Sequence, residues 1–167
     1  MESVGYDMYL KLLGEAVSEE KGEAAQSADL DCLIDISVNA HIPESYVESL
    51  TLRLDVYRRI ADIRNKEDSL DVKDELKDRF GEIPESVLGL IDIALIRNCA
   101  NAMGIYEIRQ TDTNVLLFVK EIKSPKVIEL LSRLNGRAML SAGNKPYITI
   151  RCGGDSSLDM LKKVFKI

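Results

Sequence analysis

The spacing of hydrophobic and polar positions changes along this chain of 167 residues, and the changes predict where helices and strands lie. Up to about residue 103, apolar residues mostly recur every three or four positions, as in amphipathic helices. Residues 31–38 interrupt this pattern, because apolar and polar residues alternate there. Beyond residue 104, four short alternating segments occur in pairs, and each pair is followed by a helical pattern. We therefore expect a helical half followed by a ββαββα half.

The first half of the chain predicts four helices and one short strand. The helices are expected at 4–20, at 49–64, from Asn65 or Ser69 to Phe80, and at 84–103, and the strand at 31–38. Ser49 is suited to cap the second helix, while Gly81 and Pro84 end the third and begin the fourth. The positions expected on one apolar face of the second helix are Leu50, Leu54, Tyr57 and Ala61. The fourth helix is apolar nearly all round, so we expect it at the buried centre of this half.

The second half predicts two ββα units. Strands are expected at 106–110 and 115–120 and again at 137–140 and 147–152, with helices from Ser124 to Asn135 and from Asp155 or Ser156 onward. Ile148 and Ile150 alternate with Tyr147, Thr149 and Arg151, which indicates a sheet with one buried face. The units can pack as one four-stranded antiparallel sheet with two helices on a face. The predicted fold class is α+β, a helical N-terminal half packed with a small antiparallel sheet and two helices.

Three segments of the chain differ in composition. The helix expected in residues 1–20 begins almost at the first residue, which suggests that it continues from something longer. Residues 21–30 are acidic and rich in small residues, so they are expected to form a solvated linker. Residues 31–167 are expected to form the folded domain.

The charge balance limits the classes of partner. The net charge is −6 and the isoelectric point is about 4.9, which argues against a dedicated binder of nucleic acid or of anionic membranes. A local basic cluster remains on the second helix, formed by Arg53, Arg58, Arg59 and Arg64. No uninterrupted apolar run approaches the roughly 18 residues of a membrane span, and the N-terminus lacks a signal-peptide pattern. The expected location is cytoplasmic, with no membrane partner.

Residues for catalysis or metal binding are few. The chain has one histidine, His41, and three scattered cysteines, Cys32, Cys99 and Cys152, none in a Cys-x-x-Cys pair. We expect packed, reduced thiols and a histidine in a surface turn. Phosphate-binding glycine motifs and a nucleophile elbow are also missing. We therefore expect no catalytic, cofactor-binding or metal-binding residues, and no enzyme built from this chain alone.

Three charges at the end of the third helix form the most site-like feature. At about 100° per residue, Glu75, Asp78 and Arg79 fall within about a third of the helix circumference. The adjacent apolar stripe is expected to anchor the helix, and it consists of Val72, Leu76 and Phe80. The simpler interpretation is a solvated face with an ion pair between Glu75 and Arg79. The alternative is a docking surface for another protein module.

Three blocks of sequence resemble a known family. They are Val4-Gly5-Tyr6-Asp7-Met8-Tyr9 with Leu12-Leu13 and Glu15-Ala16-Val17; Ile42-Pro43 with Tyr46-Val47, Arg53-Leu54 and Tyr57-Arg58-Arg59-Ile60; and Glu75-Leu76 with Asp78-Arg79-Phe80-Gly81 and Pro84. In combination they resemble the C-terminal domain of the bacterial transcription-repair coupling factors. Ser49 departs from the family pattern, which has an acidic residue there. Serine still caps a helix, so the departure affects an acidic contact and not the fold.

The resemblance implies a function that the residues alone do not indicate. These factors are ATP-dependent DNA translocases that displace stalled RNA polymerase and recruit excision repair through UvrA. ATP and magnesium would bind to a motor upstream of this chain, from which residues 1–20 would continue. The C-terminal domain is expected to clamp the N-terminal UvrB-like module of the same protein. Glu75, Asp78 and Arg79 match the family's interface positions, and Arg53, Arg58 and Arg59 are expected as a secondary contact.

Two other classes of function remain open from the residues. The helix from Arg53 to Arg64 could make the domain an independent nucleic-acid-binding module, with binding that weakens as salt rises. A small enzyme could use Glu75 and Asp78 as paired carboxylates, but it would need a concave pocket around them. We favour the regulatory domain over both.

Overall fold

The computed structural model describes residues 32–167, so the predicted helix at 4–20 and the linker at 21–30 lie outside the described residues. The described chain divides into two compact units, and the division falls within helix α4. The first unit comprises Val38–Leu95. The second comprises Ile96–Ile167 together with the strand that precedes Val38.

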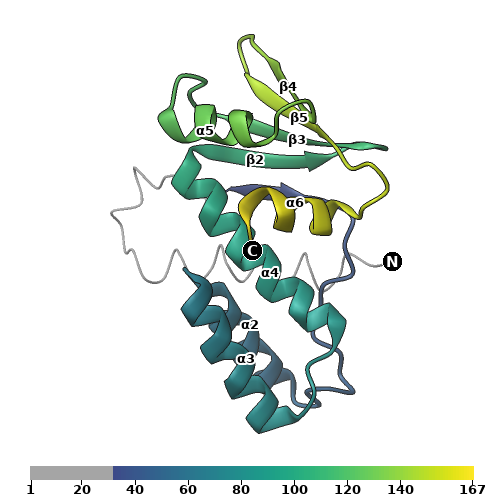
Figure 1. Ribbon diagram of the computed structural model, residues 1–167. Helices are drawn as coiled ribbons and strands as arrows, with labels where there is room; N and C mark the ends of the chain where they lie inside the picture. Colours follow the sequence, from purple (N-terminus) through teal and green to yellow (C-terminus); the bar gives the residue numbers. More distant parts are fainter. Residues whose placement is uncertain (1–31) are drawn as a thin grey trace. The chain divides into compact units, whose positions relative to one another are not determined.

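The first unit is helical. It contains α2 (Leu50–Ala61), α3 (Lys66–Phe80) and the first part of α4 (Glu85–Met103), and α2 and α3 lie side by side (Figure 1). Ser49 caps α2 as predicted, because its hydroxyl oxygen accepts a hydrogen bond from the Leu52 N–H at 3.4 Å. Asn65, and not Ser69, caps α3, since its side-chain oxygen accepts from the Asp68 N–H at 2.9 Å. Each helix therefore begins with a satisfied backbone donor.

The buried face of α2 differs from the predicted one. Val56, Tyr57 and Ile60 are buried, whereas Leu50 is 55% exposed. The buried face is therefore rotated about the helix axis relative to the predicted one, by about one residue, or roughly 100°. Tyr57 belongs to both faces, which is why the prediction was right for this residue.

Helix α4 is the most buried helix of the described chain, as predicted. The fully buried side chains include Val87, Leu90, Ile91, Ala94 and Ile96. By length and mean hydropathy Glu85–Met103 could cross a membrane, although Asp92 and Arg97 interrupt it, so the prediction of no uninterrupted apolar run of this length still holds. However, 67% of its apolar window is buried inside the protein. A core helix passes the same test.

The second unit contains one mixed sheet of five strands. In space the order is β1 (Leu33–Asp35), β2 (Ile105–Gln110), β3 (Asn114–Val119), β5 (Tyr147–Arg151) and β4 (Ala138–Ser141). Strands β2, β3, β5 and β4 form the predicted antiparallel sheet of four. Strand β1 adds a fifth strand, parallel to β2. The sheet is therefore mixed, and the α+β class is confirmed.

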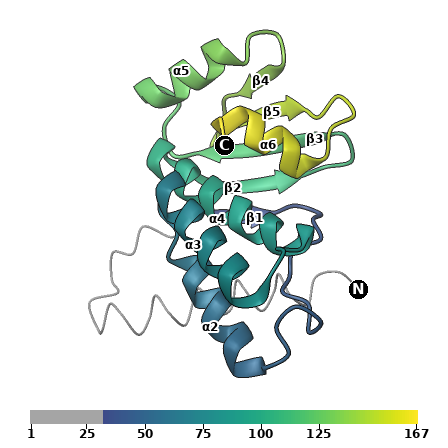
Figure 2. The same ribbon diagram turned by 60° about the horizontal axis from the view of Figure 1, so that its bottom comes forward.

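One face of this sheet is buried. Ile148 and Ile150 on β5 are fully buried, as the alternation predicted, and Val115, Leu117 and Val119 on β3 are each at most 1% exposed as well. Two helices complete the unit, α5 (Pro125–Arg133) and α6 (Ser157–Phe165), and α6 lies across the strands (Figure 2). The buried side chains of α6 are Ser157, Met160, Leu161 and Val164. Ser156, and not Asp155, caps α6 by accepting from the Asp159 N–H at 3.1 Å.

Candidate functional site on helix α3

The three predicted site residues lie on one exposed surface of α3. Val72 and Leu76 are buried, and they fix the rotation of the helix against the rest of the unit. Glu75 is partly exposed, while Asp78 and Arg79 are exposed. The structure therefore brings Glu75, Asp78 and Arg79 together, facing outward, and we call them the α3 surface.

Glu75 is the centre of an ion-pair network. Arg79 Nη1 donates to Glu75 Oε1 at 3.1 Å, which is the predicted pair between residues four apart. Arg59 Nε on α2 donates to the other carboxylate oxygen, Oε2, at 3.0 Å. Each oxygen of Glu75 thus has its own arginine. The network joins a predicted secondary residue, Arg59, to the predicted α3 surface.

The network shifts the protonation equilibria of its members. The hydrogen bond from Arg59, followed by that from Arg79, holds the pKa of Glu75 below its usual value. The same hydrogen bond raises the pKa of Arg59. Both shifts favour the charged forms, so the ion pairs persist at neutral pH.

Asp78 differs from Glu75 although it lies only one turn away. Its side chain is exposed, and within residues 32–167 it makes no hydrogen bond or ion pair. The charge of Glu75 is balanced by two arginines, whereas that of Asp78 faces water. A carboxylate of this kind can accept hydrogen bonds from an incoming cationic group without losing an existing contact.

Arg79 also contacts an aromatic pair, formed by Phe80 and Tyr46. The Arg79 guanidinium lies 4.9 Å from the centre of the Phe80 ring, a distance suited to a cation–π contact. The Phe80 ring in turn lies 5.7 Å from the ring of Tyr46. The Tyr46 hydroxyl donates a shared hydrogen bond to the carbonyl oxygens of Leu76 and Gly81, each at 3.2 Å. Tyr46 thereby ties the loop before α2 to the end of α3.

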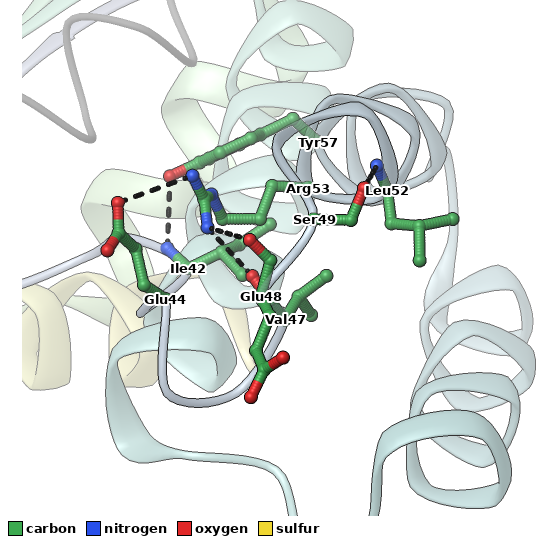
Figure 3. A network of polar contacts seen from close by, with 8 residues as sticks. All are labelled: Ile42, Glu44, Val47, Glu48, Ser49, Leu52, Arg53 and Tyr57. Atoms are coloured by element: carbon green, nitrogen blue, oxygen red, sulfur yellow. Dashed lines mark hydrogen bonds and ion pairs between the residues drawn. The ribbon is translucent and has the colours of Figure 1, made fainter.

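The predicted secondary residues on α2 have different environments. Arg53 is only 13% exposed, and its Nη1 donates to the carbonyl oxygens of Val47 at 2.8 Å and Glu48 at 3.0 Å (Figure 3). Its Nη2 also contacts the Glu44 carboxylate at 3.5 Å. These contacts hold the loop before α2, so Arg53 supports the fold from inside that loop.

Arg58 and Arg59 are the exposed members of this group. Arg58 pairs with Asp55 at 3.6 Å on its own helix, and 58% of its side chain is exposed. Arg59 is half-exposed and reaches across to α3. Only Arg59 therefore extends the α3 surface.

The site lacks the features of a catalytic centre. Its carboxylates lie on an exposed helix surface, and no group of His, Cys, Asp and Glu suited to a metal occurs in residues 32–167. No disulfide joins the cysteines of residues 32–167, of which Cys32 and Cys152 are buried and Cys99 is partly buried. Burial raises the pKa of the Cys99 thiol, which disfavours the reactive thiolate.

The fold is that of an α+β domain, and its α3 surface carries a small charged network at a helix end. The TRCF domain family matches residues 36–129, more than half of the chain. The chain belongs to this family, the TRCF domain of the transcription-repair coupling factors. The resemblance noted in the sequence is thereby confirmed.

Curated relatives agree with this assignment. The transcription-repair-coupling factor of Bacillus subtilis is 31% identical over 170 residues, which cover 98% of this chain and 14% of that protein. The factor of Staphylococcus epidermidis is 33% identical over 130 residues, covering 77% of this chain and 11% of the relative. The chain therefore spans about a seventh or less of the length of these relatives.

A solved structure has the same fold. The crystal structure of the C-terminal domain of a transcription-repair coupling factor superposes with a TM-score of 0.70 and 17% identity, covering 81% of this chain and 88% of that one. Because the coverage is high on both sides, the helical unit and the sheet unit occur together in that domain as well.

Proposed function

We propose that this chain is the autoinhibitory C-terminal domain of a transcription-repair coupling factor. It clamps the N-terminal UvrB-like module of the same protein through the α3 surface. The full-length protein would be an ATP-dependent DNA translocase, with ATP and magnesium bound in a motor outside this chain. UvrA, RNA polymerase and DNA would be reached only through that larger protein.

The observation that carries the proposal is the contrast between Glu75 and Asp78. Arg59, Glu75 and Arg79 form a pre-organised cluster with a net positive charge, and Asp78 beside it offers a negative charge that no group within residues 32–167 pairs with. A partner with the opposite arrangement can dock without breaking the cluster. Little conformational entropy is then lost on docking, because all three side chains of the cluster are already held by hydrogen bonds.

The composition of the surface also suits an interface that must open. Exposed ion pairs contribute roughly 0–1 kcal/mol each. A few of them would hold a latch of a few kcal/mol, which is enough to shift a closed–open equilibrium by orders of magnitude. A competing partner could still open such a latch, whereas it could not easily open a large apolar interface.

Calorimetric titration of the 167-residue chain with the UvrB-like module tests the proposal. We expect the unmodified chain to bind, and a variant with Glu75→Lys, Asp78→Lys and Arg79→Glu to remain folded without binding. If separate modules do not bind, the test is repeated on a covalent fusion, where the effective concentration is in the millimolar range for a short linker. If the domain docks on the UvrB-like module equally well in the fusion of the unmodified chain and in that of the triple variant, the proposal is refuted.

The nucleic-acid alternative on α2 gains no support from the side chains of that helix. Arg53 is directed inward to carbonyl groups, and Arg58 and Arg59 are engaged in ion pairs. Of the four arginines, only the Arg64 side chain lacks a contact within residues 32–167. One free arginine is too few for a phosphate-binding stripe.

A further inference from the structure

The sheet of the second unit has one face that the helices leave open. Strand register places Glu107, Phe118 and Tyr147 in one row across β2, β3 and β5. It places Arg109, Leu116 and Thr149 in the next row. All six side chains lie opposite the buried valines and isoleucines, and none of them is buried. We call this the open face.

The aromatic residues of the open face form a continuous group. The Phe118 ring lies 5.4 Å from that of Tyr147 and 6.2 Å from that of Tyr106, measured between ring centres. The Arg109 guanidinium lies 5.3 Å from the centre of the Phe118 ring and pairs with Glu107 at 2.5 Å. Partly exposed rings on neighbouring strands offer flat apolar surface to a planar ligand.

Two arginines lie opposite each other at one end of the open face. Ala138 pairs with Ile150, and the Arg151 N–H donates to the Arg137 carbonyl oxygen at 3.4 Å, so Arg137 and Arg151 are cross-strand neighbours. Both are exposed, and neither forms an ion pair within the described residues 32–167. Like charges opposite each other in a sheet repel. A bound anion would relieve this repulsion.

The wider charge distribution favours the same kind of ligand. Residues 96–167 contain twelve lysines and arginines against six aspartates and glutamates, although the whole chain has 22 against 28. The acidic net charge thus comes entirely from the first part of the chain. A strong asymmetry between the two halves of a sequence is typical of proteins that contact polyanions.

We propose that the open face binds single-stranded nucleic acid. Bases stack on Phe118 and Tyr147, and phosphates pair with Arg137 and Arg151. The aromatic row and the arginine pair are separated by four residues along β5, or about 13 Å at ~3.3 Å per residue. This function goes beyond the clamp, because it uses the second unit and none of the α3 surface.

Fluorescence anisotropy with labelled oligothymidine and oligouridine of about twenty nucleotides, at about 50 mM salt, tests this proposal. We expect both single strands to bind the 167-residue chain more tightly than a duplex of equal length. Replacing Arg137 and Arg151 together by Ala should weaken binding about tenfold or more and reduce the salt slope by about 1.4, since single strands give roughly 0.7 per phosphate contact. Tyr147→Leu should weaken binding at least about fivefold and leave the salt slope unchanged, as loss of stacking requires.

A matched control separates the open face from general charge. Arg64→Ala combined with Lys123→Ala removes the same charge from exposed side chains off the open face, and we expect it to keep most of the affinity. Equal weakening by both double variants, preference for the duplex, or no binding at low salt would each overturn the proposal. In the last case a protein would remain as the occupant of the open face. If Tyr147→Leu does not fold, the double variant of Arg137 and Arg151, compared with its matched control, still tests the proposal.

Discussion

Arg59 on α2 and Glu75 on α3 are sixteen residues apart in sequence, and they meet at 3.0 Å across the helix pair. Because Arg79 holds the other oxygen of Glu75, Glu75 is placed by two helices at once. We interpret Glu75 as the organiser of the α3 surface and Asp78 as its free contact.

This relationship makes a prediction for Arg59. Arg59→Ala should weaken docking to the UvrB-like module about three- to tenfold, because Glu75 loses one of its two restraints. The free energy of unfolding should fall by less than about 1 kcal/mol, since Arg59 and Glu75 are partly exposed. The measurements are calorimetric titration and urea unfolding. Arg58→Ala is the matched control on the adjacent position, and equal effects from the two variants would show that Arg59 has no special role.

The lowered pKa of Glu75 predicts a dependence of stability on pH. A carboxyl whose pKa is depressed by folding stabilises the protein above its unfolded pKa, about 4.3 for Glu. That contribution is lost as the pH falls through the lower pKa of the folded state. The free energy of unfolding of the unmodified chain should therefore exceed that of Glu75→Gln by less than about 1 kcal/mol above pH ~5. The difference should shrink below pH ~4, and a difference that grows in acid would contradict the assignment.

Arg53 should behave as a structural residue. Arg53→Met keeps most of the aliphatic stem but leaves the carbonyl oxygens of Val47 and Glu48 without their donor. We expect a loss of about 1–3 kcal/mol in the free energy of unfolding, typical for hydrogen bonds to a charged group. The exposed Arg58→Met should change it by no more than about 0.5 kcal/mol. Urea denaturation compares them, and similar losses would mean that the contacts of Arg53 contribute little.

Gly81 should be sensitive for backbone reasons alone. Its φ of 89° and ψ of −156° lie where L-residues are strained, yet an added Cβ would meet no atom within 4 Å. Gly81→Ala should therefore cost about 1–3 kcal/mol without any steric clash. Gly143→Ala is the control, because that site is equally open and its φ is not in the positive region. Thermal unfolding of both variants measures their losses of stability. Equal losses for Gly81→Ala and Gly143→Ala would show that the positive φ of Gly81 has no effect.

Local signals in the sequence were sufficient for most of the secondary structure. Serine is more favourable at the cap of a helix than in its interior, because at the cap its side-chain oxygen accepts a backbone N–H. The start of α2 at Ser49 was therefore predictable. The alternation at Ile148 and Ile150 likewise identified the buried face of β5. The parallel pairing of β1 with β2 could not be predicted, because it joins Ile34 to Ile108 across most of the helical half.

The site was predictable only as far as it lies within one helix. Helical spacing placed Glu75, Asp78 and Arg79 together and predicted the pair between Glu75 and Arg79. The contact from Arg59 depends on how α2 packs against α3, and the buried face of α2 carries Val56 and Ile60, not the predicted Leu50. Arg53 looked like a surface cation for the same reason, since only the folded loop shows its carbonyl partners.

The most direct test of the central claim is the affinity of Asp78→Lys for the UvrB-like module. It is measured by the calorimetric titration described above, or on the covalent fusion if the separate modules do not bind. Asp112→Lys, an equally exposed reversal in the turn between β2 and β3, is the control. We predict that Asp78→Lys weakens docking tenfold or more, which is a loss of about 1.4 kcal/mol or more in binding free energy. Both variants should unfold at the same denaturant concentration as the unmodified chain. Unchanged docking by Asp78→Lys in a folded domain would contradict the claim that the α3 surface is the latch.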